Sequence, residues 1–142
     1  MTRRLLVLVV AVILCGSTLA YLRDPPWLLT TTSGLREWET DRDGTRFRWT
    51  DGHASFFVPS EWKSVELPLR TTFGSTGDWP IAATIAIDDR PADRVTLTDG
   101  AWRRTTVRLP PRGSRRVRRI DIRVDRTRDG NRGVQLGEIS HR

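Results

Sequence analysis

The chain has 142 residues, which is room for one domain of ordinary size and excludes a second hydrophobic core. A hydrophobic fraction of 37% and a charged fraction of 29% suit a soluble domain, and eleven Gly and eight Pro favour an all-β fold with many turns. The net charge of +7 is uneven, because residues 103–132 carry twelve Arg against three Asp whereas residues 25–102 are net acidic. The chain has 23 Arg and one Lys, a bias that a GC-rich genome produces without any functional demand. Because it also lacks a recognisable nucleic-acid-binding motif, this charge does not predict nucleic-acid binding.

Residues 1–24 differ from the rest and are predicted to be either a membrane anchor or a signal peptide. Arg3 and Arg4 precede a run of sixteen uncharged residues, 5–20, a length between those typical of the two kinds of segment. Small residues up to Ala20 would permit cleavage there, giving a secreted or periplasmic protein. The apolar run passes Ala20, however, and a Pro-Pro-Trp exit follows, which favours the anchor. Both alternatives keep the N-terminus inside and export the domain.

The single cysteine, Cys15, lies within this apolar run. Leu14 precedes it, whereas a lipoprotein signal needs a small residue at that position. We therefore interpret Cys15 as an inert thiol. Since residues 25–142 contain no cysteine, the exported part has no disulfide and must be stabilised by its core.

Alternating apolar residues predict the first strands. After a linker over residues 25–34, residues 35–38 and 46–49 form a hairpin, with Phe47 and Trp49 facing inward. Asp51 and Gly52 form a second turn, which is followed by a strand over residues 53–58. A strand over residues 62–69 then places three apolar residues on one face: Val65, Leu67 and Leu69. Residues 71–79 form a long loop.

A central hairpin and a further strand follow. Apolar residues alternate over residues 81–87, which predicts a strand, and residues 88–93 are predicted to form a turn. Val95 and Leu97 continue the alternation in the returning strand. Residues 102–109 form the next strand, with Val107 and Leu109 inward, and a Pro-rich segment ends it.

Residues 116–139 are predicted to close the fold as its last hairpin. Ile120, Ile122 and Val124 share one face of a strand, whereas Asp121 and Arg123 lie on the other. A polar loop over residues 125–133 leads to a second apolar run that ends at Ile139. The prediction is an all-β, antiparallel β-sandwich of jelly-roll type with about eight strands, over residues 35–142, preceded by one N-terminal hydrophobic helix.

The order of these segments resembles a known family. FRWT at 47–50, VELPLR at 65–70, TIAIDDRPADRVTLTDGAW at 84–102, and then IDIRVDRT and LGEI carry the resemblance. They are similar to the jelly-roll, galactose-binding-like (carbohydrate-binding-module-like) domains of bacterial envelope proteins, found beside membrane sugar-transfer proteins or alone behind one anchor. The resemblance implies a non-catalytic module that recognises sugar. Asp88 and Asp89 stand where this family is expected to have Asp-Gly.

Catalytic and metal-binding patterns are scarce. His53 and His141 are the only histidines, and neither has the spacing of a metal ligand. A triad of His53 with Ser55 or Ser60 is the one catalytic alternative, and ordinary surface histidines outweigh it. Asp41 and Asp43, and likewise Asp129 and Asn131, supply only part of the ligands of an oxygen-ligand loop for calcium. We therefore predict no enzyme, no cofactor and no metal.

Six Trp are the basis for predicting sugar binding, because an exposed Trp can stack on the apolar face of a pyranose. Two candidates lie in the loop over residues 71–79 and the other four in the loop over residues 126–132. The predicted ligand-binding residues are Asp78, Trp79, Arg126, Arg128, Asn131 and Arg132.

Two hypotheses follow for function. The first is a non-catalytic exported module, tethered to the membrane by its N-terminal segment, that recognises glycan or a glycosylated envelope partner. The alternative is a structural or interaction module that docks on a membrane protein such as a glycosyltransferase. It would use its edge strands or a basic face made of Arg116, Arg118 and Arg119.

Overall fold

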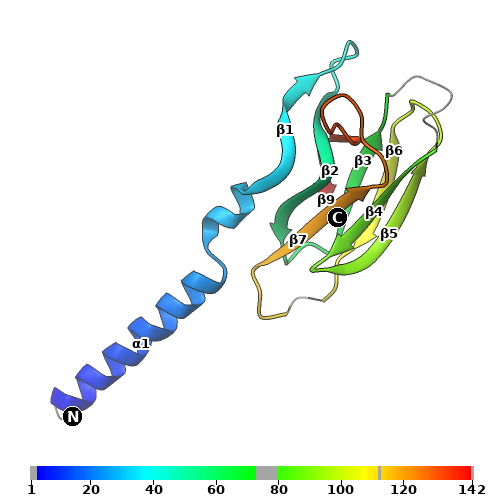
Figure 1. The fold of residues 1–142 in the computed structure, drawn as a ribbon. Coiled ribbons are helices and arrows are strands. Elements are labelled where there is room, and N and C mark those ends of the chain that lie inside the picture. The colour runs from blue at the N-terminus through cyan, green and yellow to red at the C-terminus, as the bar shows by residue number, and fades with distance from the viewer. Residues whose placement is uncertain (1–2, 73–79, 112, 142) are drawn as a thin grey trace.

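A computed structural model describes residues 3–72, 80–111 and 113–141 of the chain (Figure 1). This part contains one long helix, one short 3-10 helix and nine strands. The elements are α1 (Arg3–Arg23), η1 (Pro26–Thr30), β1 (Thr32–Thr40), β2 (Arg46–Pro59), β3 (Ser64–Arg70), β4 (Ile81–Ile87), β5 (Arg90–Leu97), β6 (Arg103–Arg108), β7 (Val117–Val124), β8 (Gln135–Gly137) and β9 (Ser140–His141).

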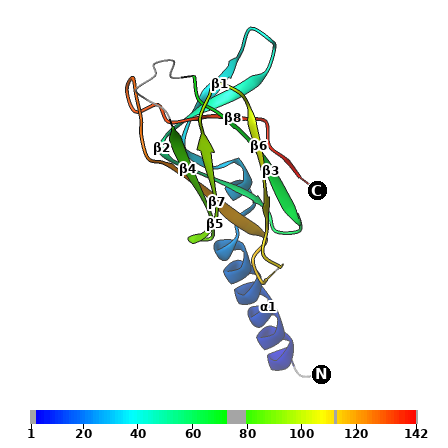
Figure 2. The same cartoon turned by 90° about the vertical axis from the view of Figure 1, so that its right-hand side faces the viewer.

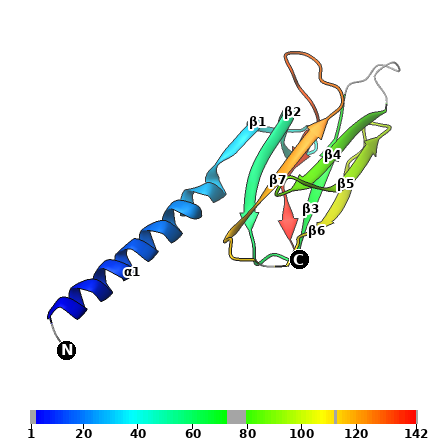
Figure 3. The ribbon, with the colours of Figure 1, turned by 60° about the horizontal axis from the view of Figure 1, so that its bottom comes forward.

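The strands form an antiparallel β-sandwich, as predicted. Hydrogen bonds link them in the order β5-β4-β7-β2-β8-β3-β6, with β1 on β2 and β9 on β3. This continuous sheet curls on itself, so that its two end strands meet: the Thr105 hydroxyl of β6 donates a hydrogen bond to Asp93 of β5 (Figure 2). The predicted N-terminal hydrophobic helix is also present and projects away from the sandwich (Figure 3).

The core confirms the period-2 predictions. Val65, Leu67 and Leu69 of β3 are fully buried. Alternate residues of β4 and β7 are buried in the same way, including Ile85 and Ile122. Each such side chain contributes about 1.5–3 kcal/mol by leaving water, which identifies the apolar face of each strand as the source of stability.

β2 is one continuous strand, so the predicted turn at Asp51 and Gly52 is wrong. Its first part pairs with β8 and its second part pairs with β7. Thr50 lies between these two parts, where its backbone N–H donates to the Val134 carbonyl at 2.8 Å and its hydroxyl accepts the Val134 N–H at 2.9 Å. Gly52 lies in the same interval, and a Cβ there would be 3.2 Å from the Thr127 side chain.

The predicted closing hairpin is also wrong, because β7 and β8 do not pair with each other. β7 lies between β2 and β4, whereas β8 lies between β2 and β3. The loop between them crosses from one layer of the sandwich to the other. Asp121, predicted on the polar face of β7, is only 3% exposed.

The turn between β4 and β5 is tighter than predicted. It consists of Asp88 and Asp89 and not of residues 88–93, and both residues have positive φ angles, of 49° and 67°. This backbone matches a two-residue type I′ hairpin turn, which normally favours Asn-Gly or Asp-Gly. The Asp88 carboxylate accepts hydrogen bonds from Arg118 Nη1 at 2.8 Å and from the Arg119 N–H at 3.0 Å, and these anchor the turn to β7.

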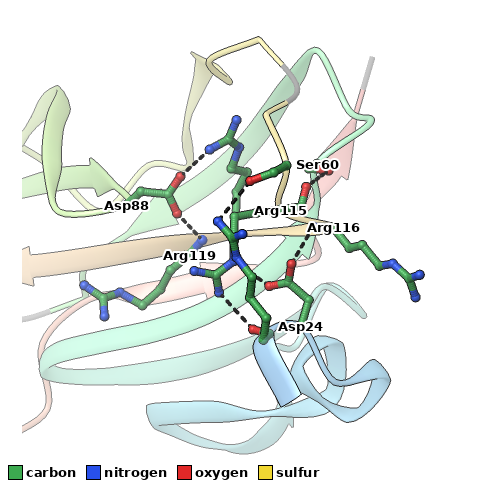
Figure 4. Close-up of polar contacts among 9 residues, drawn as sticks. Asp24, Ser60, Asp88, Arg115, Arg116 and Arg119 are labelled. Carbon is green, nitrogen blue, oxygen red and sulfur yellow. Dashed lines mark hydrogen bonds and ion pairs between the residues drawn. The ribbon is translucent and has the colours of Figure 1, made fainter. Parts of the chain in front are cut away.

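The segment predicted as a linker, residues 25–34, contains η1 and the start of β1. Just before it, Asp24 connects the end of α1 to the domain. Its carboxylate accepts hydrogen bonds from Arg115 Nε and, at 3.1 Å, from the Arg116 N–H (Figure 4). We call the end of the domain that contacts α1 the proximal end, and the opposite end, with the loop over residues 125–133, the distal end.

Candidate ligand-binding site

The predicted ligand loop, residues 126–132, closes on itself at the distal end. Arg128 and Arg132 exchange two backbone hydrogen bonds of 2.8 and 2.7 Å, and three residues between them have positive φ angles. Arg36 of β1 donates a hydrogen bond to the Gly130 carbonyl. The loop is therefore a compact turn fixed against β1.

The predicted ligand residues of this loop have different environments. Arg126, Arg128 and Asn131 are exposed. Arg132 is half-buried, with its guanidinium carbon 5.5 Å from the ring centroid of Trp49. The remaining predicted ligand residues lie outside the described residues, and their role stays a prediction: Asp78 and Trp79.

Trp38 of β1 is an exposed aromatic residue that the sequence did not single out. Its side chain is 44% exposed, and the guanidinium carbons of Arg46 and Arg48 lie 4.9 and 5.5 Å from its ring centroid. The register of β1 and β2 pairs Trp38 with Arg48 and so produces this arrangement. The sequence pattern that could have identified this site is the alternation of arginine and aromatic residues over residues 46–49. That pattern becomes informative only when the register of the hairpin, which places Trp38 opposite it, is known. A cation above a ring is attracted to its electron-rich face, so the arginines hold Trp38 in place.

A groove of about 570 Å³ adjoins Trp38 through Arg46, which lines it. Its charged side chains form two ion pairs, Arg46–Glu138 at 3.2 Å and Arg104–Glu66 at 3.3 Å. Exposed ion pairs contribute about 0–1 kcal/mol, so a ligand can rearrange these at little cost. The groove therefore presents both hydrogen-bond donors and acceptors to a polar ligand.

Trp102 provides the aromatic surface of the groove, and Arg70 fixes it from behind. The Arg70 guanidinium carbon lies 4.4 Å from the Trp102 ring centroid, while its Nε donates to Gln135 at 2.8 Å. Arg70 Nη2 also donates to Asp41, and this hydrogen bond is the largest cause of the lowered pKa of the Asp41 carboxyl. The Trp102 indole Nε1 is buried without a hydrogen-bond partner among the described residues.

The one catalytic alternative, based on His53, does not assemble as a relay. His53 Nε2 lies 3.0 Å from Asp121 Oδ1, and Ser55 bonds the same carboxylate. A Ser-His-Asp relay needs the serine hydroxyl on the second histidine nitrogen. Burial alone would raise the pKa of Asp121, but hydrogen bonds from His53, Arg119 and Ser55 hold it below the usual value. Asp121 therefore acts as an ionised structural centre.

The predicted basic face also divides into unlike residues. Arg118 is bound to Asp88 and its side chain is only 12% exposed, and Arg119 Nε is bound to Asp121 at 2.9 Å. Arg116 is exposed and has no ion pair within the described residues. Reversing all three charges would remove internal ion pairs, so it would test folding as much as docking.

Comparison with known proteins gives structural similarities alone. No protein-family model matches the sequence, and no curated protein matches it. Among solved structures, a family two carbohydrate esterase from Clostridium thermocellum in complex with cellohexaose has 7% identity and a TM-score of 0.49, over 78% of this chain and 30% of that one. The family two carbohydrate esterase from Cellvibrio japonicus has 15% identity and a TM-score of 0.48, over 78% and 31%.

A third structure is a single domain. It is the CBM36-1 domain of a multidomain xylanase from the hindgut metagenome of Trinervitermes trinervoides, with 11% identity and a TM-score of 0.45, over 77% of this chain and 86% of that one. This chain thus spans less than a third of each esterase but most of the CBM36-1 domain. At TM-scores below 0.5, these structures assign no ligand to this chain.

Proposed function

We propose that the chain is a non-catalytic, exported recognition module that is held at the membrane by α1. We further propose that it binds a glycan or a glycosylated envelope partner along the groove between Trp38 and Trp102. The observation that carries this proposal is an exposed Trp ring that continues, through Arg46, into a groove with a second Trp.

The chemistry of the groove suits sugars. A pyranose has an apolar C–H face, which stacks on an aromatic ring, and an edge of hydroxyl groups, which need both donors and acceptors. Trp38 offers the exposed ring. Arg104 and Arg46 offer donors, while Glu66 and Glu138 offer acceptors.

The dimensions of α1 support a retained anchor. It has 21 residues, which at about 1.5 Å per residue matches a hydrocarbon core of about 30 Å, and no residue of it is buried. Residues 3–30 include a window with a mean hydropathy of 2.6, enough to cross a membrane. The helix passes Ala20 without a break, and Asp24 then ties its end to the domain. Mass spectrometry of the mature N-terminus tests this part: a chain that starts at Tyr21 would refute the anchor.

Binding can be tested with the full-length protein in detergent, by pull-down on insoluble envelope polysaccharide and by glycan array. Trp38→Ala should weaken binding about 2- to 10-fold, because aromatic stacking contributes about 0.5–1.5 kcal/mol. The matched control is Trp27→Ala, since Trp27 is 56% exposed but lies on η1. Absence of glycan binding by the unmodified protein, or an equal loss in both variants, would refute the proposal.

A further inference from the structure

A second groove lies at the proximal end of the domain, where the two ends of the curled sheet meet. It has a volume of about 900 Å³ and is enclosed by β5 on one side and by β6 and the segment after it on the other. Pro91 and Ala92 form part of the first wall, and Leu109, Pro110 and Pro111 form part of the second. These five residues are apolar, and the prolines among them carry no N–H group.

Three arginines line this groove. Arg118 is held in place, because it bonds Asp88 and donates Nη2 to the Pro111 carbonyl at 2.6 Å. Its Nε is buried and has no hydrogen-bond partner among the described residues. Arg90 and Arg108 are exposed and form no ion pair within the described part of the chain. The groove thus combines one fixed guanidinium group with two uncommitted ones.

The two carboxylates of the groove already have partners. Asp88 accepts hydrogen bonds from Arg118 and from the Arg119 N–H. Asp93 accepts hydrogen bonds from the Thr105 hydroxyl and from the Arg94 N–H. Since the acidic groups are engaged while two arginines are not, the free hydrogen-bonding capacity of the groove belongs to cations, which recognise anions.

The connection between β6 and β7 places this groove beside the end of α1. Arg23 Nη2 donates to Ser114 at 2.9 Å, and Asp24 binds Arg115 and the Arg116 N–H. The same connection begins with Leu109, Pro110 and Pro111, the second wall of the groove. Figure 4 shows Asp88 and Asp24 at this same end of the domain. When α1 spans a bilayer, the end of the domain that carries this groove is the end nearest the membrane.

We infer that this groove binds the phosphate headgroup of an anionic phospholipid. Guanidinium groups match phosphate oxygens in geometry and charge, so Arg90 and Arg108 would close on a phosphate placed beside Arg118. The apolar walls would contact the glycerol and the first methylene groups. This inference rests on the anchor part of the proposed function and is independent of glycan binding.

Native mass spectrometry of the full-length protein in detergent tests the inference by counting retained lipids. The probes are dioleoyl phosphatidylglycerol and dioleoyl phosphatidylcholine, which share their acyl chains and differ in net charge. The unmodified protein should retain phosphatidylglycerol in preference. The double variant R90E/R108E should lose about tenfold or more of this affinity, because each hydrogen bond to a charged group contributes about 1.5–3 kcal/mol. Both arginines are exposed, so thermal unfolding should confirm an intact fold.

The matched control is R42E/R123E, which makes the same change of charge at two exposed arginines of the distal end. It should retain phosphatidylglycerol as the unmodified protein does. Equal retention of the two lipids, unchanged retention by R90E/R108E, or equal loss in the control would overturn the inference. Displacement of the lipid by inorganic phosphate at equal concentration would identify a free-phosphate site instead. Glycan binding by R90E/R108E should persist, which separates this test from that of the proposed function.

Discussion

Replacing Asp88 and Asp89, one at a time, by glycine should have opposite effects on stability. Both residues have positive φ angles, of 49° and 67°, which cost an L-residue about 1 kcal/mol and cost glycine almost nothing. Backbone strain alone therefore predicts that Asp88→Gly and Asp89→Gly both stabilise the protein. The difference between them comes from the hydrogen bonds that each carboxylate accepts.

Asp88 accepts hydrogen bonds from Arg118, whose side chain is only 12% exposed, and from the backbone of Arg119. Losing them removes about 1.5–3 kcal/mol and leaves a largely buried guanidinium group with fewer partners. Asp88→Gly should therefore destabilise the protein by about 1–2 kcal/mol after the relief of strain.

Asp89 has a side chain that is 75% exposed, and within the described residues it forms an ion pair with Arg119 alone. An exposed pair of this kind contributes about 0–1 kcal/mol, because solvent screens it. Arg119 also keeps its hydrogen bond to Asp121. Asp89→Gly should therefore be neutral or stabilise the protein by up to about 1 kcal/mol.

Urea unfolding of the full chain in detergent, followed by Trp fluorescence, measures both variants. A difference of about 2 kcal/mol separates the midpoints by about 1 M urea at a typical m-value. The two variants carry the same substitution at adjacent positions, so each is the control for the other. Equal destabilisation of both would show that anchoring by Arg118 does not determine the stability of this turn.

Three further predictions concern other parts of the molecule. Gly34→Ala should lower the free energy of unfolding, measured in urea, by about 3 kcal/mol, because Gly34 has a φ of +63° and an added Cβ would lie 2.0 Å from a backbone carbonyl oxygen. Gly44→Ala should lower it by only about 1 kcal/mol, because Gly44 has a φ of +82° but lies in open space. Equal losses in the two variants would contradict the clash at Gly34. The folded-state pKa of Asp121 lies below its unfolded value of about 3.9, so its contribution is complete above that pH and is lost as pH falls further. An acid titration of unfolding free energy should show this loss, and Asp121→Asn should abolish it; an unchanged pH dependence in that variant would assign the loss to another carboxylate. Asp24→Ala should leave the domain folded but accelerate amide hydrogen exchange around Arg116, because the Arg116 N–H loses the acceptor that lies 3.1 Å away. Unchanged protection there would show that the contact between the end of α1 and the domain does not depend on Asp24.

Local alternation predicted the strands and their buried faces. β3, β4 and β7 each carry apolar residues at every second position, and burial of one face of a strand is a local consequence of that pattern. The pairing partners were not predictable in the same way. Asp51 and Gly52 have the composition of a turn, yet they lie within β2, because that strand has two different partners supplied by distant parts of the chain.

The candidate site shows the same limit. Composition identified six Trp but could not say that Trp38 is exposed, because its exposure follows from its register against Arg48. The loop with Arg126 and Arg132 was found from its charge, yet its compact turn depends on a contact from Arg36 of β1. Exposed charge was likewise expected at Asp121, which is buried and is hydrogen-bonded by two residues of β2 and one of its own strand. Each of these features depends on residues far apart in the sequence.

The double pairing of β2 has a consequence for how the protein is made. β2 is synthesised early, but it needs β7 along one part and β8 along the other, and β8 is made near the end of the chain. Such non-local pairing makes folding slow, because a long loop must close before any contact stabilises it. β2 therefore has only β1 as a pairing partner until β7 and β8 have been made. The complete sheet forms only after β8 has been synthesised.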